Sequence, residues 1–189
     1  MREVVGAALG PQISFVGPFG VGKTTAVINV CNTQVVMTEV FSSNAQSPAG
    51  KHLKATTTVG LEIGEWVSPD GRVVCVVGTP GQERFDMVRR SAMPRSNAVV
   101  LWLYGGHREA LIDAQLWLEF VAKEIPSHKL VVAVTRIEDS EAALEPFRTV
   151  VDAVDFNIPL VAADPRDGDS VANVLETAFA RSMQHGLTG

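Results

Sequence analysis

The 189-residue sequence contains little cysteine or histidine and no long apolar run. Its two cysteines, Cys31 and Cys75, form neither a CxxC pair nor a zinc-ligand spacing, which argues against a disulfide framework or a zinc site. They are expected to be buried small hydrophobes in a reducing, cytoplasmic compartment. The four histidines are scattered, so a histidine metal cluster is not expected. Because no run of about 18 apolar residues occurs, a membrane-spanning helix is not expected either.

Basic residues are also too few and too dispersed for a nucleic-acid surface. Lys and Arg number 16 against 21 Asp and Glu, which gives a net charge of −5 and argues against nucleic acid as a main partner. Neither a signal peptide, a myristoylation site nor a prenylation cysteine is present, so any membrane recruitment is expected to depend on a partner. The length predicts one domain over residues 1–189, with 1–11 as a flexible lead-in.

Residues 17–24, Gly-Pro-Phe-Gly-Val-Gly-Lys-Thr, fit the phosphate-binding loop pattern GxxxxGK[ST] without a mismatch. An apolar strand precedes them and a helix follows. Glycines let successive backbone N–H groups face an anion, and the helix presents its positive dipole end to the same anion. Lys23 is expected to reach the β- and γ-phosphates, and the Thr24 hydroxyl to hold Mg²⁺. The predicted nucleotide-binding residues here are Gly17, Gly20, Val21, Gly22, Lys23, Thr24 and Thr25.

The rest of the chain alternates apolar runs with helical patterns, which is typical of a parallel sheet with helices on both faces. Strands are predicted at Gln12–Val16, Leu61–Val67, Arg72–Val77, Ala98–Tyr104, Leu130–Val134 and Pro159–Ala162. Helices are predicted at about 24–32, 86–92, 108–124, 141–153 and 169–184. The pattern therefore predicts an α/β P-loop NTPase fold with a mostly parallel, six-stranded sheet. Ligands in such folds lie beyond the carboxyl ends of the strands, where all the motifs fall.

A second motif, Val77-Gly78-Thr79-Pro80-Gly81-Gln82-Glu83-Arg84-Phe85, follows a buried strand directly. Together with the first loop and Thr58-Val59-Gly60-Leu61-Glu62, it resembles the Ras-like small GTPases, and its Gly-Gln-Glu-Arg-Phe run is close to that of Rab-type members. A Gly at the start of this loop, followed by Thr-Pro-Gly-Gln, looks most like the bacterial small GTPases. Those are encoded beside roadblock-type proteins in the actinobacterial sensor operons called conservons. The resemblance covers about residues 12–183.

The resemblance implies a small G-protein fold and a signalling switch that binds GTP or GDP with Mg²⁺ and hydrolyses GTP slowly. Thr58 would close over the nucleotide with its hydroxyl on Mg²⁺, the Gly81 N–H would bond the γ-phosphate, and Gln82 would orient the attacking water. The implied catalytic residues are Lys23, Thr58 and Gln82, and the implied metal ligands are Thr24 and Thr58. The implied partners are a roadblock/LC7-type regulatory protein and a sensor-kinase-like system.

Three motifs depart from the family pattern. Gly78 stands where most members have an Asp that supports Mg²⁺ through water. The base-reading loop, normally Asn-Lys-x-Asp, is Thr135-Arg136-Ile137-Glu138 here. In this loop Glu138 would accept hydrogen bonds from the guanine N1–H and exocyclic amine, and Arg136 would stack on the base. The last motif, normally Ser-Ala-Lys, aligns with Asp164-Pro165-Arg166, in which proline removes a donor to guanine O6. The base-side residues implied are Thr135, Arg136, Glu138, Asp164 and Arg166.

These departures leave a second function open, a nucleotide-binding scaffold with relaxed base selectivity and little turnover. Four residues that match the family pattern oppose it: Lys23, Thr24, Thr58 and Gln82. A small-molecule kinase would need an Arg-rich lid and a substrate pocket, neither of which the sequence shows. A second apolar stripe on the 108–124 helix, formed by Ile112, Leu116 and Phe120, either binds a partner or is covered by a neighbouring element.

Overall fold

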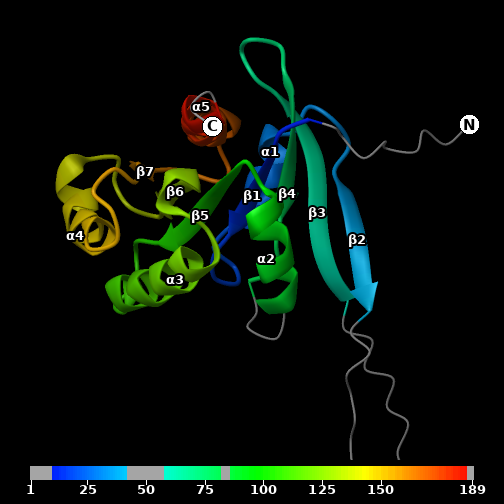
Figure 1. Cartoon of the computed structure of the whole chain (residues 1–189). Coiled ribbons are helices and arrows are strands. Elements are labelled where there is room, and N and C mark those ends of the chain that lie inside the picture. Colours follow the sequence, from blue (N-terminus) through cyan, green and yellow to red (C-terminus); the bar gives the residue numbers. More distant parts are fainter. Residues whose placement is uncertain (1–9, 42–57, 82–85, 187–189) are drawn as a thin grey trace, which may run out of the picture.

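In the computed structural model, residues 10–41, 58–81 and 86–186 are described. They form an α/β fold in which helices cover a central sheet (Figure 1). The strands of the described residues follow the order β2-β3-β4-β1-β5-β6-β7 across the sheet. The strands are β1 (Gln12–Val16), β2 (Val36–Phe41), β3 (Thr58–Val67), β4 (Val73–Gly78), β5 (Ala98–Tyr104), β6 (Leu130–Thr135) and β7 (Leu160–Ala162). The helices are α1 (Lys23–Val30), α2 (Asp86–Ala92), α3 (Ala110–Glu124), α4 (Glu141–Asp152) and α5 (Gly168–Gly186).

Parallel pairing joins β4, β1, β5, β6 and β7, whereas β2 and β3 add an antiparallel edge. β5 and β6 are buried along almost their whole length, as expected for apolar strands covered on both faces. Parallel strands end at the same edge of a sheet. The loops that follow β1, β4, β5, β6 and β7 therefore gather at one edge, which is where ligands of such folds bind.

The predicted α/β class is confirmed, but the sheet of the described residues has seven strands rather than the six predicted. The additional strand is β2, which pairs with β3 from Val36 opposite Ile63 to Phe41 opposite Thr58. Its short apolar segment gives a weak local signal, because long-range pairing with β3 is what extends it. The hairpin of β3 and β4 about the turn at Ser68–Gly71 is confirmed as antiparallel.

Two apolar layers fix the sheet against the helices. On one face α1 and α5 pack with β1, β4 and β5, and the rings of Phe15 and Trp102 meet edge-on with centroids 5.4 Å apart. On the other face α3 and α4 pack around Leu101 and Leu118. Full burial of one such side chain is worth about 1.5–3 kcal/mol, so these layers anchor the strand ends and thereby the loops that follow them.

The cysteines are half-buried rather than buried as predicted. Burial raises the pKa of Cys31 to about 12 and also raises the pKa of Cys75. Both thiols are therefore protonated at neutral pH and behave as small hydrophobes, which is the chemical role expected of them.

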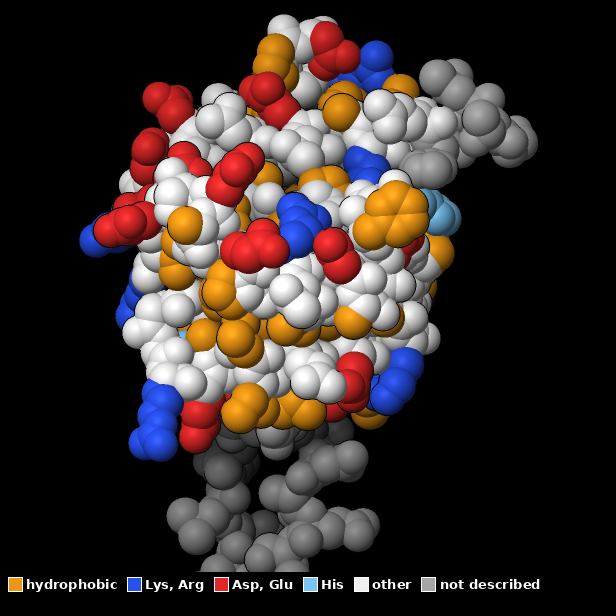
Figure 2. All heavy atoms as spheres, turned by 90° about the vertical axis from the view of Figure 1, so that its left-hand side faces the viewer, with side chains coloured by type: hydrophobic (Ala, Val, Ile, Leu, Met, Phe, Trp, Pro, Cys, Tyr) orange, Lys and Arg blue, Asp and Glu red, His pale blue; other side chains and the backbone are white. Residues whose placement is uncertain are grey.

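The surface carries charges of both signs. On the face that presents α4, acidic and basic side chains are interspersed with apolar ones (Figure 2). In the α3 stripe, Ile112 and Leu116 are 62% and 60% exposed, whereas the Phe120 ring is half-buried with the Arg90 guanidinium 5.2 Å from its centre. Within the described parts of the chain, no helix has both the length and the apolar character that a membrane span requires.

Candidate functional site

The loop of residues 17–22 connects β1 to α1 at the carboxyl edge of the sheet. Gly17, Gly20 and Gly22 have φ angles of +135°, +77° and +111°, which side-chain-bearing residues rarely adopt. A Cβ at Gly17 would lie 2.1 Å from the carbonyl oxygen of Trp102, and one at Gly22 would lie 2.6 Å from Cγ of Pro165. The loop is therefore held tightly between β5 and the segment after β7, and glycine is required on both sides.

Lys23, the first residue of α1, turns its side chain back into this loop. Its Nζ donates to the carbonyl oxygens of Gly17 and Pro18 at 2.8 and 2.7 Å, and the residue is 6% exposed. Burial lowers the pKa of Lys23 to about 8, while the nearby Glu62 carboxylate acts in the opposite direction. At neutral pH the group is still an ammonium, held where an incoming phosphate would replace the hydration it has lost.

Thr24 bonds to a carboxylate that the motifs did not assign. Its hydroxyl donates to Oε1 of Glu62 at 2.7 Å. Glu62 lies on β3 directly opposite Gly78 on β4. A Cβ at Gly78 would lie 2.4 Å from Oε2 of Glu62, so this carboxylate occupies the space that a side chain at position 78 would take. The sequence contains a signal for this pairing. Counting residues outward from the turn at Ser68–Gly71 along both strands of the hairpin places position 62 opposite position 78.

The segment after β4 lies against the phosphate loop. The backbone N–H and the hydroxyl of Thr79 both donate to the Phe15 carbonyl, at 3.0 and 2.9 Å. A Cβ at Gly81 would lie 2.3 Å from the Phe19 nitrogen, so the predicted γ-phosphate donor is next to the loop. Gln82 and the side chain of Thr58 lie outside the described residues, and their predicted roles stay predictions.

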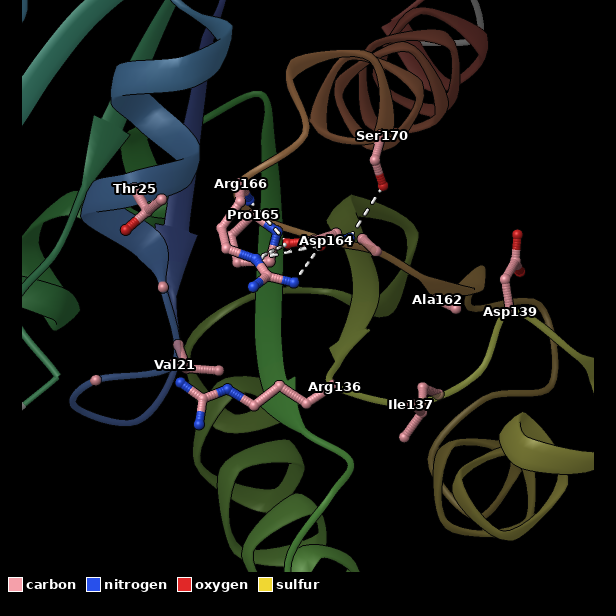
Figure 3. A pocket seen from close by; sticks show the side chains of 13 residues that line it. Val21, Thr25, Arg136, Ile137, Asp139, Ala162, Asp164, Pro165, Arg166 and Ser170 are labelled. Carbon is pink, nitrogen blue, oxygen red and sulfur yellow. Dashed lines mark hydrogen bonds and ion pairs between the residues drawn. The ribbon is translucent and has the colours of Figure 1, made fainter.

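A cavity of about 520 Å³ opens beside the phosphate loop (Figure 3). Three loops contribute its walls: the phosphate loop, the segment between β6 and α4, and the segment between β7 and α5. The lining residues are Gly20, Val21, Gly22, Thr25, Arg136, Ile137, Asp139, Ala162, Ala163, Asp164, Pro165, Arg166 and Ser170. The fold thus brings the first predicted motif together with most of the last two, although they are far apart in the sequence.

The charged residues of the cavity wall are Arg136, Asp139, Asp164 and Arg166. Arg136 has a φ of +58°, and its guanidinium lies 4.9 Å from the centre of the Tyr104 ring, with the side chain extending toward Val21 (Figure 3). Arg166 donates to both carboxylate oxygens of Asp164, with its Nη2 2.7 Å from Oδ2. These bonds hold the pKa of Asp164 down at about 2, so the carboxylate stays charged over the whole physiological range.

The structure differs from the motif alignment in the base-reading loop. Both Glu138 and Asp139 are exposed, but Asp139 is among the residues that line the cavity and Glu138 is not. Thr135 is fully buried, and its hydroxyl has no hydrogen-bond partner within the described residues. Pro165, which the sequence marks only as a lost donor, packs against Gly22 and accepts from Nδ2 of Asn29 at 3.1 Å. Asp139 was missed because it falls one residue beyond the motif.

The oxygen donors near Lys23 fit a magnesium ion. The Thr24 hydroxyl and the Glu62 carboxylate are hard ligands of the kind that Mg²⁺ prefers. Within the described residues, no group of three or more His, Cys, Asp or Glu side chains is arranged to hold a metal. The ion would therefore depend on phosphate oxygens and water for its remaining ligands, as is common for Mg²⁺ at nucleotide sites.

Comparison with known proteins establishes the fold. No protein-family model matches the sequence, and no curated protein is similar to it. Among solved structures, the cytosolic domain of the T. maritima FeoB iron transporter in a GDP form is similar, with a TM-score of 0.61 and 15% sequence identity. The match covers 90% of this chain and 62% of that one, so the chain spans less than two thirds of that structure's length. The chain therefore shares the α/β fold of that domain.

Proposed function

We propose that this protein binds guanine nucleotides together with Mg²⁺ and hydrolyses GTP slowly, as a molecular switch. One observation carries the proposal: the glycine loop that surrounds the buried Lys23 ammonium also forms part of the wall of the 520 Å³ cavity, through Gly20 and Gly22. Ligand pockets of about 300–1,000 Å³ are typical of small-molecule sites. The loop suits phosphates and the cavity suits a nucleoside, so together they match the two ends of one nucleotide.

In this proposal, separate groups of the chain bind the phosphates, the metal ion, the attacking water and the base. The loop N–H groups and the N-terminal end of α1 stabilise the phosphate charge, and Lys23 bonds the terminal phosphates. Thr24 and Thr58 would hold Mg²⁺, which would neutralise phosphate charge when bound. Gly81 donates to the γ-phosphate, and Gln82 orients the attacking water. The guanidinium of Arg136 offers a flat cationic face on which the base stacks.

A switch also needs a partner whose affinity differs between the GTP and GDP states. The roadblock/LC7-type regulator and the sensor-kinase-like system implied by the resemblance are the partners we propose. Recruitment of a cytoplasmic protein to a membrane would occur through them. The support for these partners is the motif resemblance, and a pull-down with GTP-loaded and GDP-loaded protein tests it.

The nucleotide that co-purifies with the protein tests the proposal most directly. We expect GDP or GTP, identified by ion-pair chromatography after denaturation, and binding of added GDP to the emptied protein. An adenine nucleotide would instead favour an ATP-using enzyme. Failure to bind either base would contradict the proposed function.

Gln82→Leu tests turnover. It should bind GTP within about twofold of the parent, because only the orientation of the water is lost, while hydrolysis should slow at least tenfold from a parent rate on the order of 10⁻² s⁻¹ or less. Phosphate release in single-turnover reactions measures both rates. Gln115→Leu is the matched control, since Gln115 is exposed on α3 and bonds only Glu119 among the described residues. A parent with no turnover, even with its partner present, would support the scaffold function.

Base preference is the third property to test, because the cavity wall contains Asp139 and leaves Glu138 outside. Asp139→Ala should lower the ratio of GTP to ATP affinity by about 10-fold or more. The guanine N1–H and amine would lose a charged acceptor worth about 1.5–3 kcal/mol. Glu138→Ala should change the ratio less, measured by competition binding. If Glu138→Ala lowered the ratio more than Asp139→Ala, Glu138 would be the residue that reads the base, as the motif alignment predicts.

Two observations favour the scaffold with relaxed selectivity as the second candidate. The buried Thr135 hydroxyl, which stands where the family has an Asn, bonds nothing within the described residues. Pro165 at the cavity wall has no N–H to offer to guanine O6. A site that leaves such bonds unmade discriminates weakly, so near-equal GTP and ATP affinities in the parent would select this candidate.

A further inference from the structure

The sequence lacks a carboxylate at position 78, yet the structure places one in the same space. We propose that Glu62 supplies from β3 the carboxylate missing at Gly78, and that it positions Thr24 as a ligand for the nucleotide-bound Mg²⁺. The proposal rests on the proposed function, because the ion would be held together with the nucleotide.

The two oxygens of the Glu62 carboxylate have separate surroundings. Oε1 accepts the Thr24 hydroxyl proton at 2.7 Å. Oε2 lies over Gly78, 2.4 Å from where a Cβ would stand. A hydroxyl that donates its proton to a carboxylate keeps its lone pairs free for a cation and fixes their direction. The bond to Glu62 therefore orients Thr24 for the ion.

Strand register explains why a Glu at 62 and a Gly at 78 occur together. The two residues are direct cross-strand partners, and such partners have Cβ atoms only about 5 Å apart. Alternation along β3 places Glu62 on the same face as Trp66, which is buried in the core against α5. On this face a side chain at 78 would also meet Val27 of α1, at 3.2 Å. A carboxylate from β3 reaches Thr24 only if position 78 is left empty.

Because Glu62 is charged, the proposal predicts different effects on nucleotide binding with and without Mg²⁺. The carboxylate is close enough to raise the pKa of Lys23 against the larger effect of burial. Without a divalent cation its negative charge repels the phosphates, whereas with the cation it contributes to binding the ion. Removing the charge should therefore weaken nucleotide binding in Mg²⁺ and leave it equal or tighter without Mg²⁺. A residue with a merely structural role would weaken both.

The experiment measures the release of a fluorescent GDP analogue as a function of free Mg²⁺ at pH 7, with an EDTA arm. Glu62→Gln should raise the Mg²⁺ concentration needed to retain GDP by about 10- to 100-fold, as found for residues that hold metal ligands. Glu65→Gln is the matched control on the same strand and should stay within about twofold. Urea unfolding of each nucleotide-free variant checks that the fold is intact.

Moving the carboxylate from position 62 to position 78 tests whether Mg²⁺ binding can be restored. Gly78→Asp alone places a second carboxylate against Glu62 and should destabilise the protein, because the space is occupied. Glu62→Ala alone should raise the Mg²⁺ concentration needed to retain GDP. Combining it with Gly78→Asp places the new carboxylate in the freed space and should lower that concentration again by at least tenfold. The proposal is overturned if Glu62→Gln leaves the Mg²⁺ dependence unchanged, or if it weakens GDP binding equally with and without Mg²⁺. A parent that binds no GDP overturns the proposed function, and this proposal with it.

Discussion

Lys23→Ala is expected to weaken GDP and GTP binding by about 10²- to 10⁴-fold. Each hydrogen bond to a charged group is worth about 1.5–3 kcal/mol, and the ammonium is positioned to make two with the terminal phosphates. The structure supports this role, because Nζ bonds only loop carbonyls among the described residues and sits inside the glycine loop. Calorimetric titration of the emptied protein with GDP measures the loss.

Two controls separate this effect from a loss of structure. Lys123→Ala removes an exposed lysine from α3 and should leave the affinity unchanged. Urea unfolding of nucleotide-free Lys23→Ala should show a small change in stability, because the substitution removes a buried charge along with two hydrogen bonds. An affinity for GDP within about threefold of the parent would mean that the glycine loop is not the phosphate site.

Gly17→Ala is expected to lower the free energy of unfolding by about 3 kcal/mol or more. The new methyl group would stand 2.1 Å from the backbone oxygen of Trp102, on the interior strand β5, at a φ of +135°. Strand β5 cannot shift without breaking its pairing with β1 and β6. The melting temperature should fall by about 6–12 °C, as measured by scanning calorimetry.

Gly71→Ala provides the matched comparison. Gly71 also has a positive φ, +83°, but in the turn between β3 and β4 an added Cβ would meet no described atom within 4 Å. Its substitution should cost only the backbone strain, about 1–2 kcal/mol. Equal losses at the two positions would show that the phosphate loop relaxes away from Trp102.

Features that depend on neighbours along the chain could be predicted from the residues alone. The phosphate loop is one continuous segment, so its glycines, Lys23 and Thr24 can be recognised from spacing alone. In the structure its glycines have positive φ angles, and Lys23 bonds the Gly17 carbonyl. The same holds for the apolar runs of β5 and β6, whose burial on both faces leaves a direct signature in composition. These local signals were enough to predict the α/β class and the edge at which the motifs meet.

Features that depend on strand pairing and loop geometry could be seen only in the folded chain. β2 exists because it pairs with β3, which no local propensity encodes strongly. The position of Asp139 rather than Glu138 at the cavity depends on the course of the loop after Arg136, where a positive φ redirects the chain. In the sequence, Gly78 indicates only that the carboxylate of the family pattern has been lost. In three dimensions the opposite strand fills its place with Glu62, because residues distant in the chain become direct neighbours across a sheet.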